Sequence, residues 1–280
     1  MTTGSADSVK QLRDRTGAGM MDCKAALLTT NGDIEKAIDV LRKKGVAQAA
    51  KRAGREAKEG LVIACIEGKK AALVEANCET DFVARTEDFK NLALMALEET
   101  FSQGEKAMAS EKIVQKVAEL STKIGEKILI RRVKLVTSDQ GVLFVYIHSN
   151  HKLGVVLEIL VSDKSKKNPE LVELGKNLAM QVAAASPIGV TRKDISPTIV
   201  EREKAIFKEE VKGKPENIVE KIIQGKLDKF YQSSCLLEQP FIRDDKLSVQ
   251  SLIKQVSDKI GDPIEIRQFT RFQLGENQVS

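Results

Sequence analysis

The sequence contains no tryptophan, and two tyrosines and nine phenylalanines bring its aromatic content to only 4%. Proteins that bind single-stranded nucleic acid by stacking gather several aromatic side chains in one place, and this sequence has no such cluster. It also lacks any run of about 20 apolar residues, the length that spans a bilayer. Residues 1–10 are polar and show no hydrophobic signal region. We therefore expect a cytoplasmic protein that does not bind membranes.

Cysteine and histidine, the usual zinc ligands, are also scarce, with four and two residues. A zinc site needs convergent Cys and His ligands at short spacings, and no Cys-x-x-Cys pair is present. We therefore predict no metal and no cofactor, and thiols that pack as small apolar groups. The sequence offers no Ser or Cys in a recognisable nucleophile context, so we expect that the protein is not an enzyme. An enzyme that uses His148, or Cys65 and Cys78, is the alternative. The residues concerned are Cys23, Cys65, Cys78, Cys235, His148 and His151.

The sequence also has no large excess of positive over negative charge. The 45 lysines and arginines against 40 acidic residues give a net charge of +5, with both signs interspersed. A nucleic-acid-binding protein usually shows a concentrated basic face, so we expect no stable nucleic-acid binding. A ribosome- or RNA-binding protein remains an alternative, because two basic groups stand out: Lys51, Arg52, Arg55 and Lys58, and the pair Arg131-Arg132.

Three short helices are predicted within residues 1–45. A glycine-containing turn at 16–19 separates the first two, and Asn31-Gly32-Asp33 separates the second from the third. The third helix has apolar residues at the i, i+3, i+4, i+7 spacing from Ile34, and is expected to end near Gly45. Residues 46–59 are rich in Ala, Lys and Arg without apolar periodicity, and are predicted to form a helical or extended linker.

The remainder contains an internal repeat. In residues 60–138, two apolar runs flank a hairpin turn at 67–69, followed by a helix carrying Phe82 and Phe89, a second helix and a third strand. The same order recurs in residues 139–190 and 233–280. Two related β-β-α-α-β units, each burying a sheet face under helices, predict an α+β core.

The two units are also similar in amino-acid sequence near their ends. Residues 123–131 read KIGEKILIR, and residues 259–267 read KIGDPIEIR. In each copy a helix is expected to end at the glycine and to lead into the closing strand.

An insertion at residues 191–232 interrupts the second unit. It contains two amphipathic segments separated by Gly213-Lys214-Pro215, which predicts an antiparallel helical hairpin. The sequence leaves open whether this hairpin projects from the core or packs within it.

Thr80-Asp81-Phe82 directly follows the first predicted hairpin. In one interpretation Thr80 or Asp81 caps the next helix and Phe82 staples that helix to the sheet. In the other, a charge and an apolar wedge protrude together toward another protein.

Several stretches resemble the elongation factor Ts family, almost end to end and in family order. The resemblance is carried by LRDRTGAGMMDCKAAL at 12–27, NGDIEKAID at 31–39, ETDFVAR at 79–85, KIGEKILIRRV at 123–133, LAMQVAAASP at 178–187 and QPF at 239–241.

The resemblance implies an N-terminal module similar to ubiquitin-associated domains, a two-part core and a protruding helical hairpin. It also implies an exchange factor that binds the GTPase elongation factor Tu with bound GDP, disturbs its magnesium and phosphate site, and stabilises the nucleotide-free state until GTP binds. The sequence leaves open whether the complex is one-to-one or two-to-two. The partner-binding residues that it implies are Thr80, Asp81, Phe82, Val83, Ile124, Gly125, His148, Lys10, Arg13, Met20, Met21, Lys24, Ile242 and Arg243.

The turn after His148 and the residue at position 243 depart from the family pattern. The turn at 149–152 lacks the usual glycine, and Arg243 stands where an apolar residue is common.

Overall fold

The computed structural model of the chain describes residues 5–211 and 215–276. Leu12, Cys23 and Leu27 lie in the small apolar core of an N-terminal module, so the predicted three-helix unit is confirmed. Its helices are α1 (Ala6–Thr16), α2 (Met20–Thr29) and α3 (Ile34–Arg52).

The third helix is longer than the sequence indicates. Its predicted end near Gly45 is wrong, because α3 continues to Arg52. Gly45 is buried where α3 packs on α6 (Glu111–Ile124), and a Cβ there would lie 2.8 Å from Thr122 Oγ1. This glycine therefore allows two helices to approach closely and does not end one. Of the predicted linker, only residues 53–58 lie outside helix and strand.

Two three-stranded antiparallel sheets follow. In both, the ladder between the middle and last strands shifts register after a glutamate, at Glu75 and at Glu158. The shared bulge supports the predicted repeat, because bulges are specific features of a fold. The first sheet has β1 (Glu59–Glu67), β2 (Lys70–Cys78) and β3 (Leu129–Thr137), and the second has β4 (Gly141–Ile147), β5 (Leu153–Leu160) and β8 (Glu265–Gln273).

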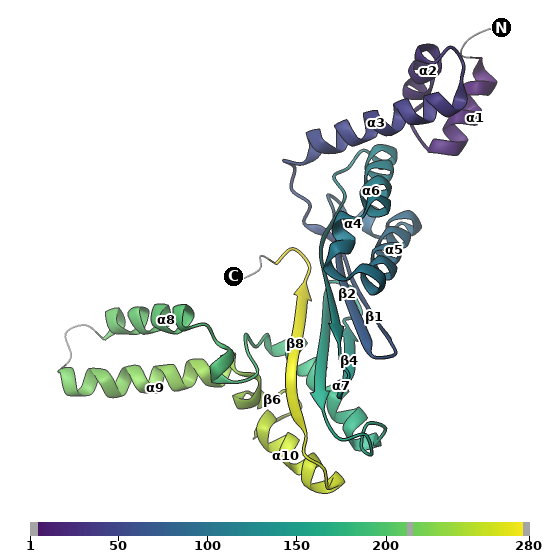
Figure 1. The fold of residues 1–280 in the computed structure, drawn as a ribbon. Helices are drawn as coiled ribbons and strands as arrows, with labels where there is room; N and C mark the ends of the chain where they lie inside the picture. The colour runs from purple at the N-terminus through teal and green to yellow at the C-terminus, as the bar shows by residue number, and fades with distance from the viewer. Residues whose placement is uncertain (1–4, 212–214, 277–280) are drawn as a thin grey trace.

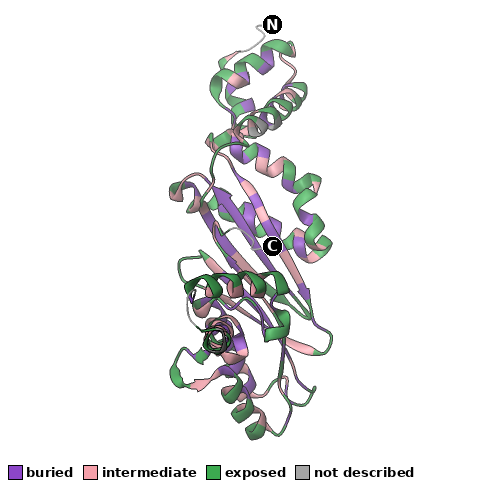
Figure 2. Cartoon of the chain, turned by 90° about the vertical axis from the view of Figure 1, so that its left-hand side faces the viewer, coloured by how far each residue is buried: buried purple, intermediate pink, exposed green. Residues whose placement is uncertain are grey.

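Helices cover one face of each sheet (Figure 1). Helices α5 (Glu87–Gln103) and α6 cover the first sheet, and α7 (Pro169–Ala185) and α10 (Val249–Ile260) cover the second. The remaining faces pack on each other, so buried residues follow the strands through the middle of the molecule (Figure 2). The α+β class is confirmed, whereas the boundary between two subdomains stays a prediction. The interior between the sheets contains Val62, Leu73, Leu143, Val156 and Phe272.

The repeated glycines end helices, as the sequence predicts. Gly125 and Gly261 have φ values of 86° and 65°, in the left-handed region that favours glycine. Their amides donate to the carbonyls of Ser121 and Ser257 at 2.9 and 3.0 Å, which closes α6 and α10.

The insertion projects from the core as an antiparallel pair of helices, α8 (Pro197–Glu210) and α9 (Glu216–Ser234) (Figure 1). No residue of α8 is buried, so the projecting arrangement is the one observed. Of the predicted break, Gly213 and Lys214 lie outside the described residues. The sequence did not predict the short strand pair that follows, β6 (Pro240–Phe241) and β7 (Asp244–Ser248).

The base of the hairpin is closed by backbone hydrogen bonds. The Ile188 amide donates to the Ser234 carbonyl, and the Leu236 amide donates to the Gly189 carbonyl, both at 2.9 Å. We predict that replacing residues 197–230 with a short Gly/Ser loop leaves a core that unfolds in one cooperative transition, because these bonds remain. Urea denaturation followed by circular dichroism measures this.

The matched control removes residues 169–185 in the same way. That helix buries Leu171, Leu174 and Leu178, so its loss should abolish the transition. A hairpin-free variant without a cooperative transition would show that α8 and α9 belong to the core.

Candidate functional site

An exposed tip follows β2. Thr80 has an extended backbone and caps the short helix α4 (Asp81–Ala84), accepting a hydrogen bond from the Val83 amide at 3.4 Å. Val83 is buried, whereas Phe82 is 81% exposed. The predicted cap is confirmed, but the prediction that Phe82 staples its helix to the sheet is wrong. In this one-turn helix Val83 and, in part, Ala84 face the core, and Phe82 faces away from it.

The single helix expected to carry both Phe82 and Phe89 is two helices. Thr86 caps α5 and accepts a hydrogen bond from the Phe89 amide at 3.4 Å. Phe89 lies fully buried on the face of α5 that covers the first sheet. Because α4 and α5 are separate, the outward side chain of Phe82 is independent of the apolar face of α5.

The tip is bound to the loop that joins α6 to β3. Glu126 Oε2 accepts hydrogen bonds from the amides of Glu79 and Thr80, both at 3.1 Å. Its Oε1 accepts from the Thr80 hydroxyl at 2.7 Å. In the reverse direction, Glu79 Oε1 accepts from the Lys127 amide at 2.6 Å. This loop also contains Gly125, so the structure brings together two groups of residues that the sequence predicted separately.

Ile124 and Gly125 differ in exposure. Ile124 is half-buried and packs against the core of the first unit, while Gly125 is exposed. The Gly125 carbonyl lies 3.5 Å from an Arg55 Nη1 that also donates to Glu79 Oε1 at 3.2 Å. The segment after α3 therefore contacts the same loop.

Hydrogen bonding lowers the pKa of Glu79. The largest cause is the Lys127 amide, and Arg55 adds to it. The unfolded value is about 4.3, so this carboxylate contributes stability above that pH and loses it as the pH falls through the folded pKa. We predict that wild type exceeds Glu79→Gln in unfolding free energy most at neutral pH, and that the difference shrinks between about pH 5 and 3.

Urea denaturation at several pH values measures this difference. Glu67→Gln, which removes an exposed carboxylate from the β1–β2 turn, serves as the control. If the unfolding free energies of wild type and Glu79→Gln differed by the same amount at every pH in this range, the prediction would be wrong.

The β4–β5 turn contains no glycine and is closed by a backbone hydrogen bond. His148 is exposed, its amide donates to the Leu153 carbonyl at 2.9 Å, and its Nδ1 lies 2.9 Å from the Tyr146 hydroxyl. His151 has a φ of 54°, the left-handed conformation that glycine adopts easily. The Asn150 side chain stabilises the turn by accepting from the Lys152 amide at 2.9 Å.

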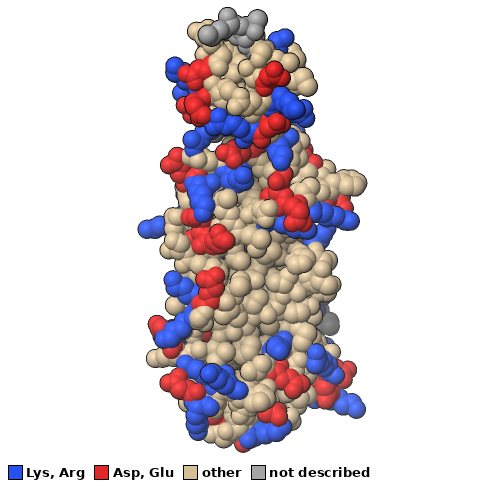
Figure 3. Space-filling model, turned by 90° about the vertical axis from the view of Figure 1, so that its right-hand side faces the viewer, with Lys and Arg blue, Asp and Glu red and all other residues tan. Residues whose placement is uncertain are grey.

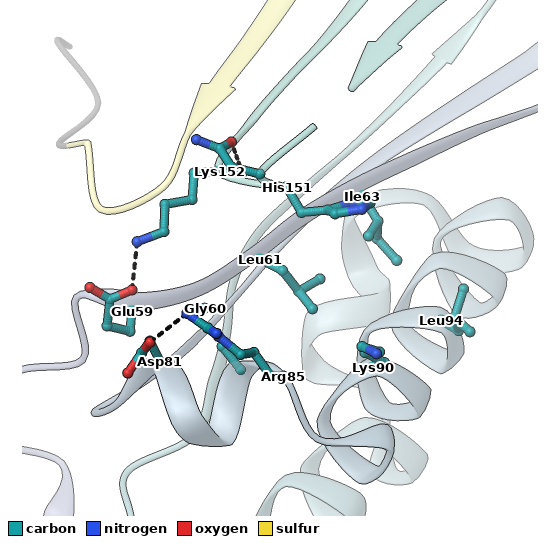
Figure 4. A pocket seen from close by; sticks show the side chains of 12 residues that line it. Glu59, Gly60, Leu61, Ile63, Asp81, Arg85, Lys90, Leu94, His151 and Lys152 are labelled. Atoms are coloured by element: carbon teal, nitrogen blue, oxygen red, sulfur yellow. Dashed lines mark hydrogen bonds and ion pairs between the residues drawn. The ribbon is translucent and has the colours of Figure 1, made fainter. Parts of the chain in front are cut away.

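A cavity of about 540 Å³ lies between this turn and the tip (Figure 4). Asp81 lines it from α4 and pairs with Arg85 at 2.8 Å, while His151 lines it from the turn. The tip and the turn that carries His148 thus belong to one surface. The cavity combines an apolar lining with charged groups: Leu61, Ile63, Ala84, Leu94, Glu59, Lys90 and Lys152.

The other predicted partner-binding residues lie elsewhere on the surface. Lys10, Arg13, Met20, Met21 and Lys24 are all exposed on α1 and α2. Figure 1 places these helices at one end of the molecule and β6 beside the base of the hairpin.

Ile242 and Arg243 are exposed between β6 and β7. The Ile242 amide donates to the Oε1 of Gln181, which is fully buried, at 2.8 Å. Gln181 also donates to the side chain of buried Gln239 at 3.1 Å, so two of the recognisable motifs, LAMQVAAASP and QPF, hold this loop.

The thiol of Cys78, just before the tip, is buried. Burial raises the pKa of the Cys78 thiol to about 12, so it is protonated at neutral pH. In residues 5–211 and 215–276, no three Cys, His, Asp or Glu side chains are placed to hold a metal ion. No helix in those ranges is long and apolar enough to cross a bilayer. What the tip offers is an apolar ring held in solvent beside a carboxylate.

The sequence analysis missed Glu126. Its signal was present in the repeat, because an acidic residue follows the helix-ending glycine in both copies, as Glu126 and as Asp262. The spacing alone did not show that this residue reaches back to the end of the middle strand.

Several known proteins are similar in sequence to this chain over nearly its whole length. The family described as "Elongation factor TS" matches residues 79–276. Elongation factor Ts of Prosthecochloris aestuarii (strain DSM 271 / SK 413) is 43% identical, over 98% of this chain and 100% of its own length. The proteins of that name from Lawsonia intracellularis (strain PHE/MN1-00) and Clostridium perfringens (strain SM101 / Type A) are 43% and 42% identical, over 97% of this chain and 99% and 93% of their own lengths. The chain therefore belongs to the elongation factor Ts family of translation elongation factors.

Proposed function

We propose that this chain binds elongation factor Tu with bound GDP and promotes the release of GDP, as an exchange factor and not as an enzyme. The observation that carries the proposal is Phe82, an aromatic ring 81% exposed at a tip whose backbone is fixed by hydrogen bonds. Large aromatic side chains presented in this way are typical anchors of protein interfaces. A translational GTPase works where protein synthesis takes place, so the proposal puts the chain in the cytoplasm.

The proposed mechanism needs no reacting group. A GTPase holds GDP through backbone amides and a magnesium ion that bridges phosphate oxygens and protein ligands. On this proposal Asp81 and Phe82 insert between helices of the GTPase domain and disturb that site. Coupling between two ligands is reciprocal. A factor that binds the nucleotide-free GTPase more tightly must therefore weaken the binding of GDP. Rebinding of a nucleotide, in cells GTP, then displaces the factor.

One side chain is not enough for a large effect. Lowering the affinity of the GTPase for GDP a thousandfold requires about 4 kcal/mol of differential binding. Burying one phenylalanine yields about 1.5–3 kcal/mol. The proposal therefore includes further contacts, from the exposed Met20 and Met21 on α2, from the turn with His148, and from Ile242.

The structure weakens the RNA-binding alternative. Cations of the basic groups are engaged within the chain: Arg52 donates to the Ser121 carbonyl at 3.2 Å, and Arg55 pairs with Glu79 at 3.2 Å. Arg132 pairs with buried Glu75 at 2.6 Å. On the face drawn in Figure 3 charges of both signs mix, and the middle is largely uncharged. Such a surface does not favour a polyanion.

The test is the release of fluorescent GDP from elongation factor Tu, followed in a stopped-flow instrument with excess unlabelled nucleotide. We expect the release rate to rise with the concentration of this protein and then to saturate. The same traces with heat-denatured protein should match the spontaneous rate. A native protein that leaves the spontaneous rate unchanged at every concentration would exclude the proposal.

A further inference from the structure

We infer that Glu126 is a positioning residue for exchange: its carboxylate fixes α4 and thereby the direction in which Phe82 points. The inference rests on the function proposed above and adds a residue from another element. Glu126 acts through Thr80, which lies two residues after Cys78, the last residue of β2, and caps α4.

The helix that carries Phe82 cannot fix its own position. It has four residues, and an isolated helix of that length is not stable in water. Its orientation therefore depends on the chain on either side. On the N-terminal side, the Cys78 thiol donates to the Thr80 carbonyl at 3.1 Å, and this carbonyl also accepts from the Ala84 amide at 3.3 Å.

Glu126 binds this junction with three hydrogen bonds at 2.7–3.1 Å, two of them from backbone amides. Hydrogen bonds that a carboxylate accepts are among the stronger ones in proteins, and two adjacent amides that donate to one carboxylate fix the backbone orientation at Glu79 and Thr80. The Thr80 hydroxyl donates to Glu126 and so keeps its oxygen lone pairs for the Val83 amide. One carboxylate thus sets both the peptide before α4 and the rotamer of its capping side chain.

A second connection runs between the same two segments. Glu79 accepts from the Lys127 amide at 2.6 Å, and the Lys127 ammonium donates to the carbonyls of Ala53 and Arg55, the latter at 2.7 Å. The loop that holds the tip is therefore itself bound to the segment that directly follows α3.

The second unit contains a corresponding carboxylate, which also binds the chain just after the middle strand of its sheet, but no exposed tip follows that strand. Asp262 follows the glycine that ends α10 and accepts a hydrogen bond from the hydroxyl of Ser162, just after β5. Hydrogen bonds from Ser162 and Ser165 lower the pKa of Asp262. No exposed aromatic ring is carried there, since the chain continues with Asp163 and Lys164. Asp262 therefore provides a matched control for Glu126.

The first experiment uses the free protein and does not depend on the proposed function. Amide hydrogen exchange is measured by NMR for wild type, Glu126→Ala, Glu126→Gln and Asp262→Ala. In Glu126→Ala the Thr80 and Val83 amides should exchange at least about tenfold faster, while amides in the middle of α5 stay unchanged, which also shows that the variant is folded. Glu126→Gln keeps one carbonyl oxygen for the two amides and should show intermediate rates. Unchanged exchange at Thr80 and Val83 would overturn the inference.

The second experiment is a double-mutant cycle in GDP release, with Glu126→Ala, Phe82→Ala and the double variant. Glu126→Ala should lower the saturating release rate about tenfold, whereas Asp262→Ala should stay within about twofold of wild type. In the Phe82→Ala background, Glu126→Ala should have no further effect, because there is no ring left to position. Equal losses in both backgrounds would show that Glu126 acts independently of Phe82.

The two experiments separate the two claims. If wild type fails to accelerate release while Glu126→Ala still frees the Thr80 and Val83 amides, the proposed function is wrong and the positioning of α4 stands. If wild type accelerates release and Glu126→Ala does so equally well, the proposed function stands and the inference is wrong.

Discussion

Phe82→Ala should reduce the stimulated release of GDP about 10- to 100-fold and leave the stability of the free protein almost unchanged. The ring is 81% exposed, so its removal breaks few contacts within the chain, and surface substitutions usually change stability by less than about 0.5 kcal/mol. At an interface, burial of the same ring is worth about 1.5–3 kcal/mol, which corresponds to this range of rates. The release rate and the urea midpoint are measured on the same preparations.

A suitable control for this substitution is Val114→Ala. Val114 is also an exposed apolar residue, and it lies in the first turn of α6, whereas the tip is bound near the last turn. It should affect neither assay. A large fall in the urea midpoint of Phe82→Ala, with release at the wild-type rate where the variant is folded, would contradict the wedge and favour a packing role.

Phe89→Ala should give the opposite result, a loss of about 3–5 kcal/mol in the free energy of unfolding. Phe89 is only seven positions from Phe82 but is fully buried between α5 and the first sheet, among Leu92, Val74 and Ile130. Removing the ring leaves a cavity that the surrounding strands cannot fill. Since the free energy of unfolding of a protein domain is about 5–15 kcal/mol in total, this variant should be close to unfolding.

Urea denaturation monitored by circular dichroism measures the loss. Phe89→Leu keeps most of the apolar volume and should cost much less, which separates a cavity effect from a general sensitivity of the position. A loss below about 1 kcal/mol for Phe89→Ala would mean that α5 is not anchored by this ring.

The contrast between these two residues shows where sequence reasoning stops. Both are phenylalanines in one polar stretch, and periodicity suggested one helix with both on its apolar face. The caps at Thr80 and Thr86 could each be recognised, but whether one helix or two results depends on contacts with the α6–β3 loop. Those contacts join residues 46 to 48 positions apart, which local patterns do not encode.

Other features could be predicted because their causes are local. Gly125 and Gly261 end helices through a backbone conformation that glycine favours, and the first hairpin turns where Glu67-Gly68-Lys69 predicts it. Gly45 has a different cause. It is required by the proximity of Thr122 on another helix, so its sequence context resembled a helix end and gave the wrong prediction. The stacking of the two sheets is likewise a tertiary property, although the apolar residues on both faces of β2 are consistent with it.

The continuous α3 has a consequence for how a partner meets this protein. Its 19 residues span about 28 Å without a flexible joint, and its second half is packed on α6. For any partner that touches both α2 and the tip, the first contact acts as a tether and makes the second one intramolecular. Because the tether is stiff, the effective concentration of Phe82 at its target is set by geometry and not by the statistics of a flexible chain. Three or four glycines inserted near position 50 would keep every contacting side chain and lower this concentration, so such a variant would associate normally through α2 and yet engage its tip less often.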